Sequence, residues 1–225
     1  EVGSYFSIIK AIAAGNHKLS TIAAVLEVKS TNLTKYLKTL MDLDILERRV
    51  PVTEENPEKS KRGLYKIKDN YLRFWFAFIY PNMSFIESGH SGIVMDKIRR
   101  GLTTSHIGFV YEDICQEQMW ELNVNNAWPF QFSKLGGYWD AKNEIDIAAL
   151  DPEGKNLILG ECKYWKEPVG LNVLHALEAK ACDVAWERDR RKVWYVLFSI
   201  SGFSDELRNH AATRDDLLLI DDRNE

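Results

Sequence analysis

Two carboxylates and one amine occur at a spacing that could bind a metal ion and a phosphate. Asp146 lies in the apolar run Glu-Ile-Asp-Ile-Ala-Ala-Leu, and Glu161 and Lys163 lie in the run Leu-Ile-Leu-Gly-Glu-Cys-Lys. Ionised groups in such surroundings are costly to bury unless they are paired or bind an ion. A divalent metal between the carboxylates would offset their repulsion, polarise a phosphate and activate a bound water. Lys163 could orient that water or help to deprotonate it.

The two runs are predicted to form a β-hairpin that places the three groups on one face. Asp-Pro-Glu-Gly lies between them and is typical of a type I turn. If Leu150 pairs with Lys155, Asp146 faces the residue two places before the glutamate. The two carboxylates are then diagonal neighbours, about 7–8 Å apart between backbones. Because strand side chains alternate, the lysine shares their face.

A solvated strand end is the alternative interpretation of this cluster, since charged residues beside a turn are usually exposed. The apolar flanks favour a buried site. Cys162 lies between the glutamate and the lysine and should face the other way, as a core thiol. Together with Cys115 and Cys182 it makes an odd number of cysteines without CxxC spacing. Neither a disulfide framework nor a zinc site is predicted, and a reducing cytoplasm is the expected location.

Residues 1–68 are predicted to form a winged helix-turn-helix domain. Apolar periodicity predicts three helices, the third capped by Ser30 or Thr31, followed by strands at 45–52 and 64–68 around a charged wing. Several polar side chains of the third helix and the wing could contact phosphates and base edges. These DNA-binding candidates are Asn32, Lys35, Lys38, Lys61 and Arg62. A domain connector or protein-binding module is the alternative use of this region.

Charge is divided unevenly along the chain. Residues 1–80 hold 13 Lys or Arg against 9 Asp or Glu, whereas residues 81–225 hold 16 against 24. The basic part is the one expected to approach nucleic acid, and the change of sign favours a boundary near Pro81. Residues 69–80 are apolar nearly all round and are predicted to form a buried helix within a helical connector, 69–104. No run is long enough for a membrane helix, so no membrane partner is expected.

Residues 105–225 are predicted to form an α/β (α+β) domain in the order helix, three strands, helix, strand, helix, strand. The first strand is expected around 130–135, followed by Gly136, Gly137 and the hairpin. The segment 192–200 is so continuously apolar that it should lie inside the sheet with both faces covered.

The pattern Asp146, hairpin turn, Glu161-Cys162-Lys163 resembles the catalytic core of the PD-(D/E)xK nuclease superfamily, whose fold is restriction-endonuclease-like. The resemblance implies a mixed sheet flanked by helices. It also implies that Asp146, Glu161 and the main-chain carbonyl of Cys162 hold Mg²⁺ or Mn²⁺, and that Lys163 positions the attacking water. Ile145 occupies the place of the Pro that names the superfamily, a departure that is frequent among its active members.

Two further residues take roles from the same resemblance. Glu112, on the helix before the sheet, lies where an auxiliary acid often completes the site, although a solvated helical Glu is the alternative. Lys180, on the helix after the hairpin, is a candidate for steadying the DNA phosphate, although a solvated Lys is the alternative. The wider context, including Gly-Tyr-Trp, Gly-Glu-Cys-Lys-Tyr-Trp and Pro-Val-Gly, resembles a C-terminal domain of unknown function found on archaeal and some bacterial P-loop ATPases.

Two hypotheses of function follow. The first is an enzyme, a magnesium-dependent DNA phosphodiesterase (endonuclease) with a winged-helix DNA-binding domain. The second is a catalytically silent nuclease-like module that serves as the DNA- or protein-binding arm of an ATPase. No P-loop motif occurs in the 225 residues, so any ATPase domain would lie N-terminal to them, which agrees with a start at Glu1 instead of Met. Self-association as a homo-oligomer is compatible with either hypothesis.

Overall fold

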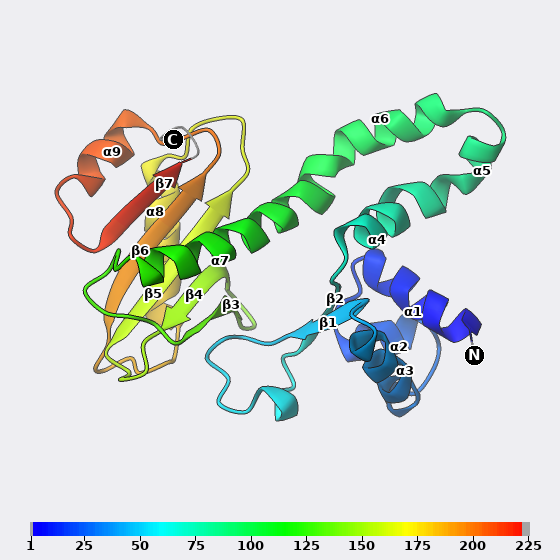
Figure 1. Ribbon diagram of the computed structural model, residues 1–225, viewed down its shortest axis with the longest axis horizontal. Helices are drawn as coiled ribbons and strands as arrows, with labels where there is room; N and C mark the ends of the chain where they lie inside the picture. The colour runs from blue at the N-terminus through cyan, green and yellow to red at the C-terminus, as the bar shows by residue number, and fades with distance from the viewer. Residues whose placement is uncertain (1, 222–225) are drawn as a thin grey trace. The chain divides into compact units, whose positions relative to one another are not determined.

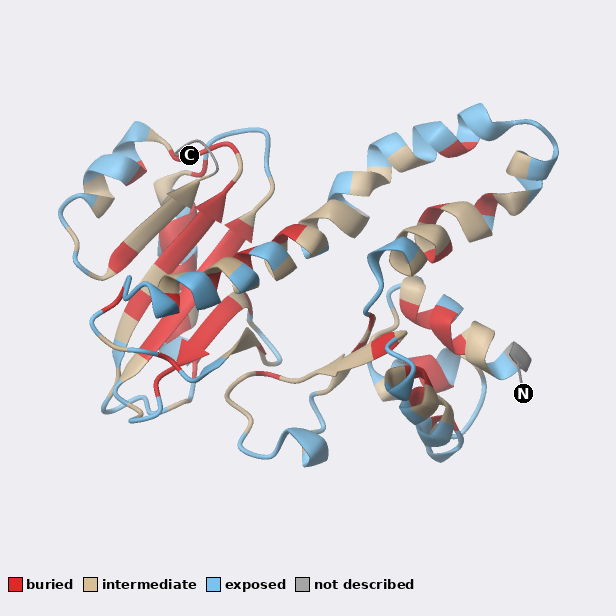
Figure 2. Cartoon of the chain, in the orientation of Figure 1, coloured by how far each residue is buried: buried red, intermediate tan, exposed pale blue. Residues whose placement is uncertain are grey.

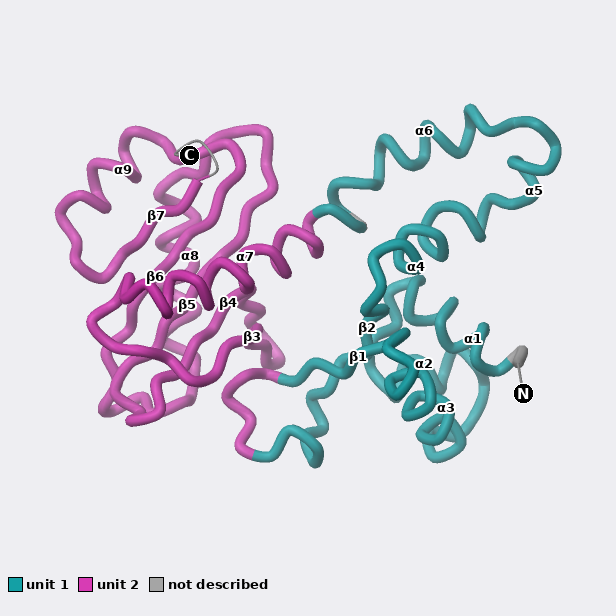
Figure 3. The backbone as a smooth tube through the Cα atoms, viewed as in Figure 1, with its two compact units in different colours: residues 1–50, 56–107 teal, residues 51–55, 108–225 magenta. Residues whose placement is uncertain are grey.

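The computed structural model describes residues 2–221, and the chain divides into two compact units (Figure 3). One unit comprises residues 1–50 and 56–107, and the other comprises residues 51–55 and 108–225. A two-stranded sheet lies in the first unit and a five-stranded mixed sheet in the second, so the predicted α+β class is confirmed. Across the described residues, none of the helices combines the length and the apolar character needed to cross a membrane.

The first unit begins with three helices and two paired strands, which are the elements expected of a winged helix-turn-helix (Figure 1). Its elements are α1 (Val2–Ala13), α2 (Leu19–Val25), α3 (Ser30–Asp42), β1 (Leu46–Arg49), η1 (Pro57–Lys59) and β2 (Leu64–Ile67). β1 and β2 pair antiparallel, and Leu46 and Ile67 pack with the apolar faces of the three helices. The expected cap of α3 was wrong. Lys29 is the N-cap and makes no side-chain bond there, so Ser30 belongs to the first turn of the helix.

A series of short helices follows the wing. They are α4 (Asn70–Phe74), the π-helical η2 (Trp75–Ile79), η3 (Tyr80–Asn82), α5 (Met83–Glu87), α6 (Ser91–Leu102) and the π-helical η4 (Thr103–Ile107). The Asp69 side chain caps α4 by accepting the Leu72 N–H at 2.7 Å. The Phe6 ring lies 5.0 Å from the Phe76 ring and 4.8 Å from the Tyr80 ring. These aromatic side chains therefore contribute to the core that they share with α1.

The second unit follows the predicted order of elements. They are α7 (Gly108–Val124), β3 (Lys134–Trp139), β4 (Glu144–Leu150), β5 (Asn156–Lys163), α8 (Leu171–Asp183), β6 (Lys192–Ser199), α9 (Asp205–Ala211) and β7 (Leu217–Asp221). The sheet order is β3-β4-β5-β6-β7, antiparallel from β3 to β5 and parallel from β5 to β7. β6 is an inner strand, as predicted, and β4, β5 and β6 are largely buried (Figure 2).

The sheet separates two apolar layers. Side chains of β4 and β5 that pack against α8 and α9 include Ala148, Leu150, Leu157 and Leu159. The alternate side chains face α7 and include Ile147, Ala149, Ile158 and Cys162. A residue's position in its strand thus decides which helices it meets.

The first strand of the sheet departs from the prediction. β3 runs from Lys134 to Trp139, so it begins four residues later than expected and includes both glycines. Its register against β4 shifts between Gly136 and Tyr138, which marks a β-bulge. The Gly137 carbonyl accepts the Val52 N–H at 3.0 Å. Glycine in a strand commonly marks a bulge or a close approach of backbones, and here it does not mark a turn.

Gly160 is required by the close packing of β5 against its neighbours. A Cβ at this position would lie 2.6 Å from Val196 Cγ1 and 2.9 Å from the Val196 carbonyl oxygen. We expect Gly160→Ala to lower the free energy of unfolding by about 1–3 kcal/mol, because β6 backbone must move to admit the methyl group. The measurement is denaturant unfolding of the second unit within the full chain. Gly92→Ala in α6 is the matched control, with no atom within 4 Å, and should not destabilise the protein. Equal midpoints for Gly160→Ala and the parent would contradict the observed packing.

Candidate metal and phosphate site

The hairpin register brings Asp146 and Glu161 directly opposite each other. Leu150 pairs with Leu157 and Ala148 pairs with Leu159, so the next facing pair on this side consists of the two carboxylates. The predicted pairing of Leu150 with Lys155 was wrong by two residues. A shift of two preserves the face of every side chain, but it turns a diagonal relation into a direct one.

The longer turn explains the shifted register. The Asp151 carboxylate accepts the Lys155 N–H at 3.0 Å and the Asn156 side-chain amide at 2.6 Å. Gly154 adopts a φ of +72°, which L-residues rarely adopt. The expected β-turn is present, since the Gly154 N–H donates to the Asp151 carbonyl at 3.4 Å. The connection extends beyond this turn, and pairing resumes where the Asp151 N–H donates to the Asn156 carbonyl at 3.3 Å.

Four charged side chains meet at the ends of β4 and β5. Lys163 Nζ lies 3.4 Å from Asp146 Oδ2 and also forms an ion pair with Glu161. The Cys162 N–H donates to Asp146 Oδ2 at 2.9 Å. From α8, Lys180 Nζ donates to Glu161 Oε1 at 2.6 Å. The Glu161 side chain is only 6% exposed and that of Asp146 16%, so these charges interact with little screening by water.

The two carboxyl groups differ in their electrostatic state. Burial, together with the negative charge of Glu161, raises the pKa of Asp146 to about 6. Burial alone would raise the pKa of Glu161 as well, but Lys163 and Lys180 outweigh burial and hold that pKa below its ordinary value. Burial opposes the charged form of Lys163, yet Asp146 and Glu161 raise the pKa of its amine, which is therefore protonated at neutral pH.

The donor set fits a hard divalent cation. Mg²⁺ and Mn²⁺ favour carboxylate oxygens, and Mg²⁺ commonly keeps several waters while bound by one or two carboxylates. The raised pKa of Asp146 reflects burial and the repulsion of Glu161, and a bound cation would offset both. No group of three or more His, Cys, Asp or Glu side chains arranged for a metal occurs among residues 2–221. Asp146 and Glu161 would therefore supply the side-chain ligands, and the Cys162 carbonyl and water would complete the coordination.

The auxiliary role of Glu112 stays a prediction. The residue lies on α7, whose buried side chains Tyr111 and Cys115 pack against the opposite face of the sheet. Burial raises the pKa of the Cys162 thiol well above its usual range, and the neighbouring Cys115, Asp146 and Glu112 raise it further. Cys162 is thus a buried, protonated thiol on the α7 side, as predicted.

Two contributors to the site were not identified from the sequence. Gln116, one helical turn after Glu112, donates from Nε2 to the Asp146 carbonyl at 3.3 Å. The Glu144 carbonyl accepts from Lys180 Nζ at 2.7 Å. Gln116 lies one helical turn after Glu112, so its position on the same face of the helix could have indicated a contact with the site. A main-chain acceptor such as the Glu144 carbonyl leaves no signal in the sequence.

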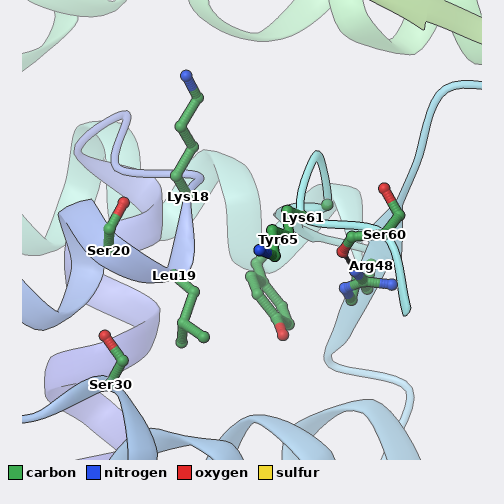
Figure 4. Close-up of a pocket in the computed structure, with 9 residues that line it drawn as sticks. Lys18, Leu19, Ser20, Ser30, Arg48, Ser60, Lys61 and Tyr65 are labelled. Carbon is green, nitrogen blue, oxygen red and sulfur yellow. Dashed lines mark hydrogen bonds between the residues drawn. The ribbon is translucent and has the colours of Figure 1, made fainter. Parts of the chain in front are cut away.

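A second, basic site lies in the winged helix. A pocket of about 340 Å³ is lined by Lys18, Leu19, Ser20, Ser30, Arg48, Ser60, Lys61, Gly63 and Tyr65. Figure 4 shows Lys18, Ser20 and Ser30 on one side of it and Arg48, Ser60 and Lys61 on the other. The Arg48 guanidinium is held at the wing by the carbonyls of Pro57, at 2.8 Å, and Ser60, at 2.6 Å. Of the basic side chains at this pocket, Lys61 was predicted to bind DNA, whereas Lys18 and Arg48 were not.

Four other predicted DNA-binding residues lie in the same unit as this pocket. Asn32, Lys35 and Lys38 are exposed on α3, and Arg62 is exposed in the wing. Asn32 lines a separate pocket of about 370 Å³ beside Tyr36. The Lys35 amine lies 4.6 Å from the centre of the Tyr36 ring. Lys180 belongs instead to the carboxylate cluster of the second unit.

Because the pKa of Asp146 is raised and that of Glu161 is lowered, we expect neutral substitutions at the two positions to change the free energy of unfolding in opposite directions. The pKa of Asp146 rises from 3.8 to about 6 on folding, so its ionisation lowers stability as the pH rises through that range. Asp146→Asn should therefore raise the free energy of unfolding of the metal-free protein by about 1–3 kcal/mol at pH 7 and leave it unchanged near pH 4. Glu161→Gln should lower it at pH 7, because the lowered pKa of Glu161 means that its charge stabilises the fold. Denaturant titrations at the two pH values test both variants, and equal effects would contradict the assignment.

Comparisons with known proteins show similarity to proteins of unknown function. Residues 75–181, just under half of the chain, match DUF234, a family described as archaea bacterial proteins of unknown function. A stretch of 167 residues is 41% identical to an uncharacterized protein of Methanocaldococcus jannaschii. That match covers 74% of this chain and 37% of the relative, so most of the relative lies outside the region compared.

Among solved structures, a repair endonuclease from Pyrococcus abyssi is similar with a TM-score of 0.30 and 12% sequence identity. The similarity covers 46% of this chain and 44% of that chain. A TM-score this low does not indicate a shared fold.

Proposed function

We propose that the chain carries a metal-dependent DNA phosphodiesterase site of the PD-(D/E)xK type on a restriction-endonuclease-like sheet. The observation that supports the proposal is the convergence of Asp146, Glu161 and Lys163 on one face at the ends of two paired strands. Asp146 and Glu161 would hold Mg²⁺ or Mn²⁺, with the Cys162 carbonyl as a further ligand. The bound cation would polarise the phosphodiester and lower the pKa of its water.

The protein groups have distinct tasks in this proposal. The Cys162 N–H fixes one oxygen of Asp146 and so orients the carboxylate at the end of β4. Lys163 is protonated at neutral pH, which suits an amine that donates to the attacking water or to the phosphate. A general base would instead need a lowered pKa. The raised pKa of Lys163 favours an orienting role over proton abstraction.

The winged helix would hold the DNA. Lys18, Arg48 and Lys61 gather at one pocket, and Asn32, Lys35, Lys38 and Arg62 add exposed polar and basic side chains nearby in the sequence and fold. Contacts of this kind bind the phosphate backbone and set the register of the protein on the duplex. The proposal also takes this chain to be the C-terminal part of an ATPase that acts on DNA in the cytoplasm.

A second candidate function is a nuclease-like module that binds DNA or a protein without cutting. Its support is that the negative charge of Glu161 is already compensated by ion pairs with the amines of Lys163 and Lys180. A balanced cluster of this kind can stabilise the fold without any catalytic role.

The enzyme proposal predicts DNA cleavage that depends on the cluster. Plasmid and linear DNA incubated with Mg²⁺ or Mn²⁺ should be cut by the parent and protected by a chelator. Asp146→Ala and Lys163→Ala should each lower the rate by about 10²–10⁴-fold, because one removes a metal ligand and the other a positioned donor. Gel electrophoresis over time measures the rate.

Lys155→Ala is the matched control for this assay, since it removes a lysine of the same hairpin that is paired with Glu153 at the far turn. It should cut at the parent rate. A parent that cuts no DNA with either metal, or alanine variants that cut as fast as the parent, would refute the enzyme proposal and favour the silent module.

DNA binding by the winged helix predicts a steep dependence of affinity on salt. Lys61→Ala should weaken binding to all DNA sequences and reduce the slope of log affinity against log salt by about 1, as expected for the loss of one phosphate contact. A fluorescence anisotropy titration at several salt concentrations measures the slope. Lys155→Ala again serves as the control, and an unchanged slope for Lys61→Ala would exclude Lys61 from the interface.

A further inference from the structure

The amine of Lys180 is paired with Glu161, which is one of the two carboxylates proposed to bind the metal. This amine donates to Glu161 Oε1 at 2.6 Å and to the Glu144 carbonyl at 2.7 Å. The lysine is held there by its place on α8, where Leu177 and Ala181 on either side of it are buried against the sheet. Its side chain is 29% exposed, so the amine is not deeply enclosed and can leave the carboxylate for water.

The two oxygens of Glu161 are assigned to different amines. Lys163 pairs with Oε2 and Lys180 pairs with Oε1. Asp146, in contrast, is contacted by Lys163 and by the Cys162 N–H, both at Oδ2. A cation that approached both carboxylates would find an oxygen of Glu161 occupied by Lys180. One ammonium charge must then give way, because two cations that share one oxygen repel each other.

We propose that Lys180 is a resident counter-cation of Glu161 that competes with the divalent metal and is displaced when the metal binds. The inference rests on the proposed metal site. Lys163 stays paired with Asp146 and Glu161, while the amine of Lys180 swings toward solvent. Metal affinity is thereby set partly by the free energy of the Lys180–Glu161 pair.

The role differs from that of a solvated surface lysine or a simple phosphate contact. Removing the amine of a phosphate contact would leave metal affinity unchanged, whereas removing a competitor increases it. The Lys180–Glu161 pair also links α8 to β5, and the bond to the Glu144 carbonyl links α8 to β4. Displacement of Lys180 therefore releases both links and makes its amine available on the side of the bound metal.

Mn²⁺ titration of the full chain without DNA tests the proposal, with the free ion followed by electron paramagnetic resonance. Lys180→Met keeps the length of the side chain and removes its charge. It should lower the Mn²⁺ dissociation constant by roughly tenfold, because the competing charge near the carboxylates is gone. Lys180→Arg retains a cation and should bind Mn²⁺ about as the parent does.

Lys142→Met is the control for net charge, since Lys142 is exposed in the turn before β4. It should leave the dissociation constant unchanged, and thermal unfolding without metal verifies that each variant is folded. If the parent binds Mn²⁺ and Lys180→Met binds it equally or more weakly, the competitor role is refuted while the metal site stands. If neither protein binds Mn²⁺, and Asp146→Ala makes no difference, both the metal site and the competitor role are refuted.

Discussion

The proximity of two carboxyl groups in a poorly solvated place is the constraint on which the rest of the site depends. Asp146 and Glu161 face each other across two paired strands with little access to water, and neither can be charged there without a compensating cation. The chain meets this requirement unequally. Glu161 holds two amines and a lowered pKa, whereas Asp146 keeps a raised one. The imbalance leaves one carboxylate prepared for a further positive charge.

Apolar side chains pack against both faces of the strands that carry these charges. α8 and α9 cover the face of the carboxylates with aliphatic side chains, and α7 covers the other face. Because α8 is anchored by Leu174 and Leu177, it delivers Lys180 to Glu161 without depending on that ion pair for its position. Packing therefore fixes where the charges lie, and the charges decide what the site can bind.

The opposite face supports the site without sharing its chemistry. The Gln116 side chain of α7 donates to the Asp146 carbonyl, and the Cys162 N–H donates to the Asp146 carboxylate. The Cys162 side chain lies in the apolar layer. Glu112 acts on this layer, where its charge helps to keep the thiol protonated. The family resemblance implies an auxiliary acid at Glu112, and this role stays a prediction.

The sequence by itself determined the order of elements and the face of each strand residue, because helical and strand periodicities are local properties. It therefore placed Asp146, Glu161 and Lys163 on one side of a hairpin. Only the three-dimensional structure decided the register, because bonds from the Asp151 side chain to Lys155 and Asn156 extend the connection beyond the expected turn. It also decided that Gly136 and Gly137 lie in a bulged strand and that Lys180 reaches Glu161. The last two features arise from contacts between different segments of the chain, and no local pattern of residues encodes such contacts.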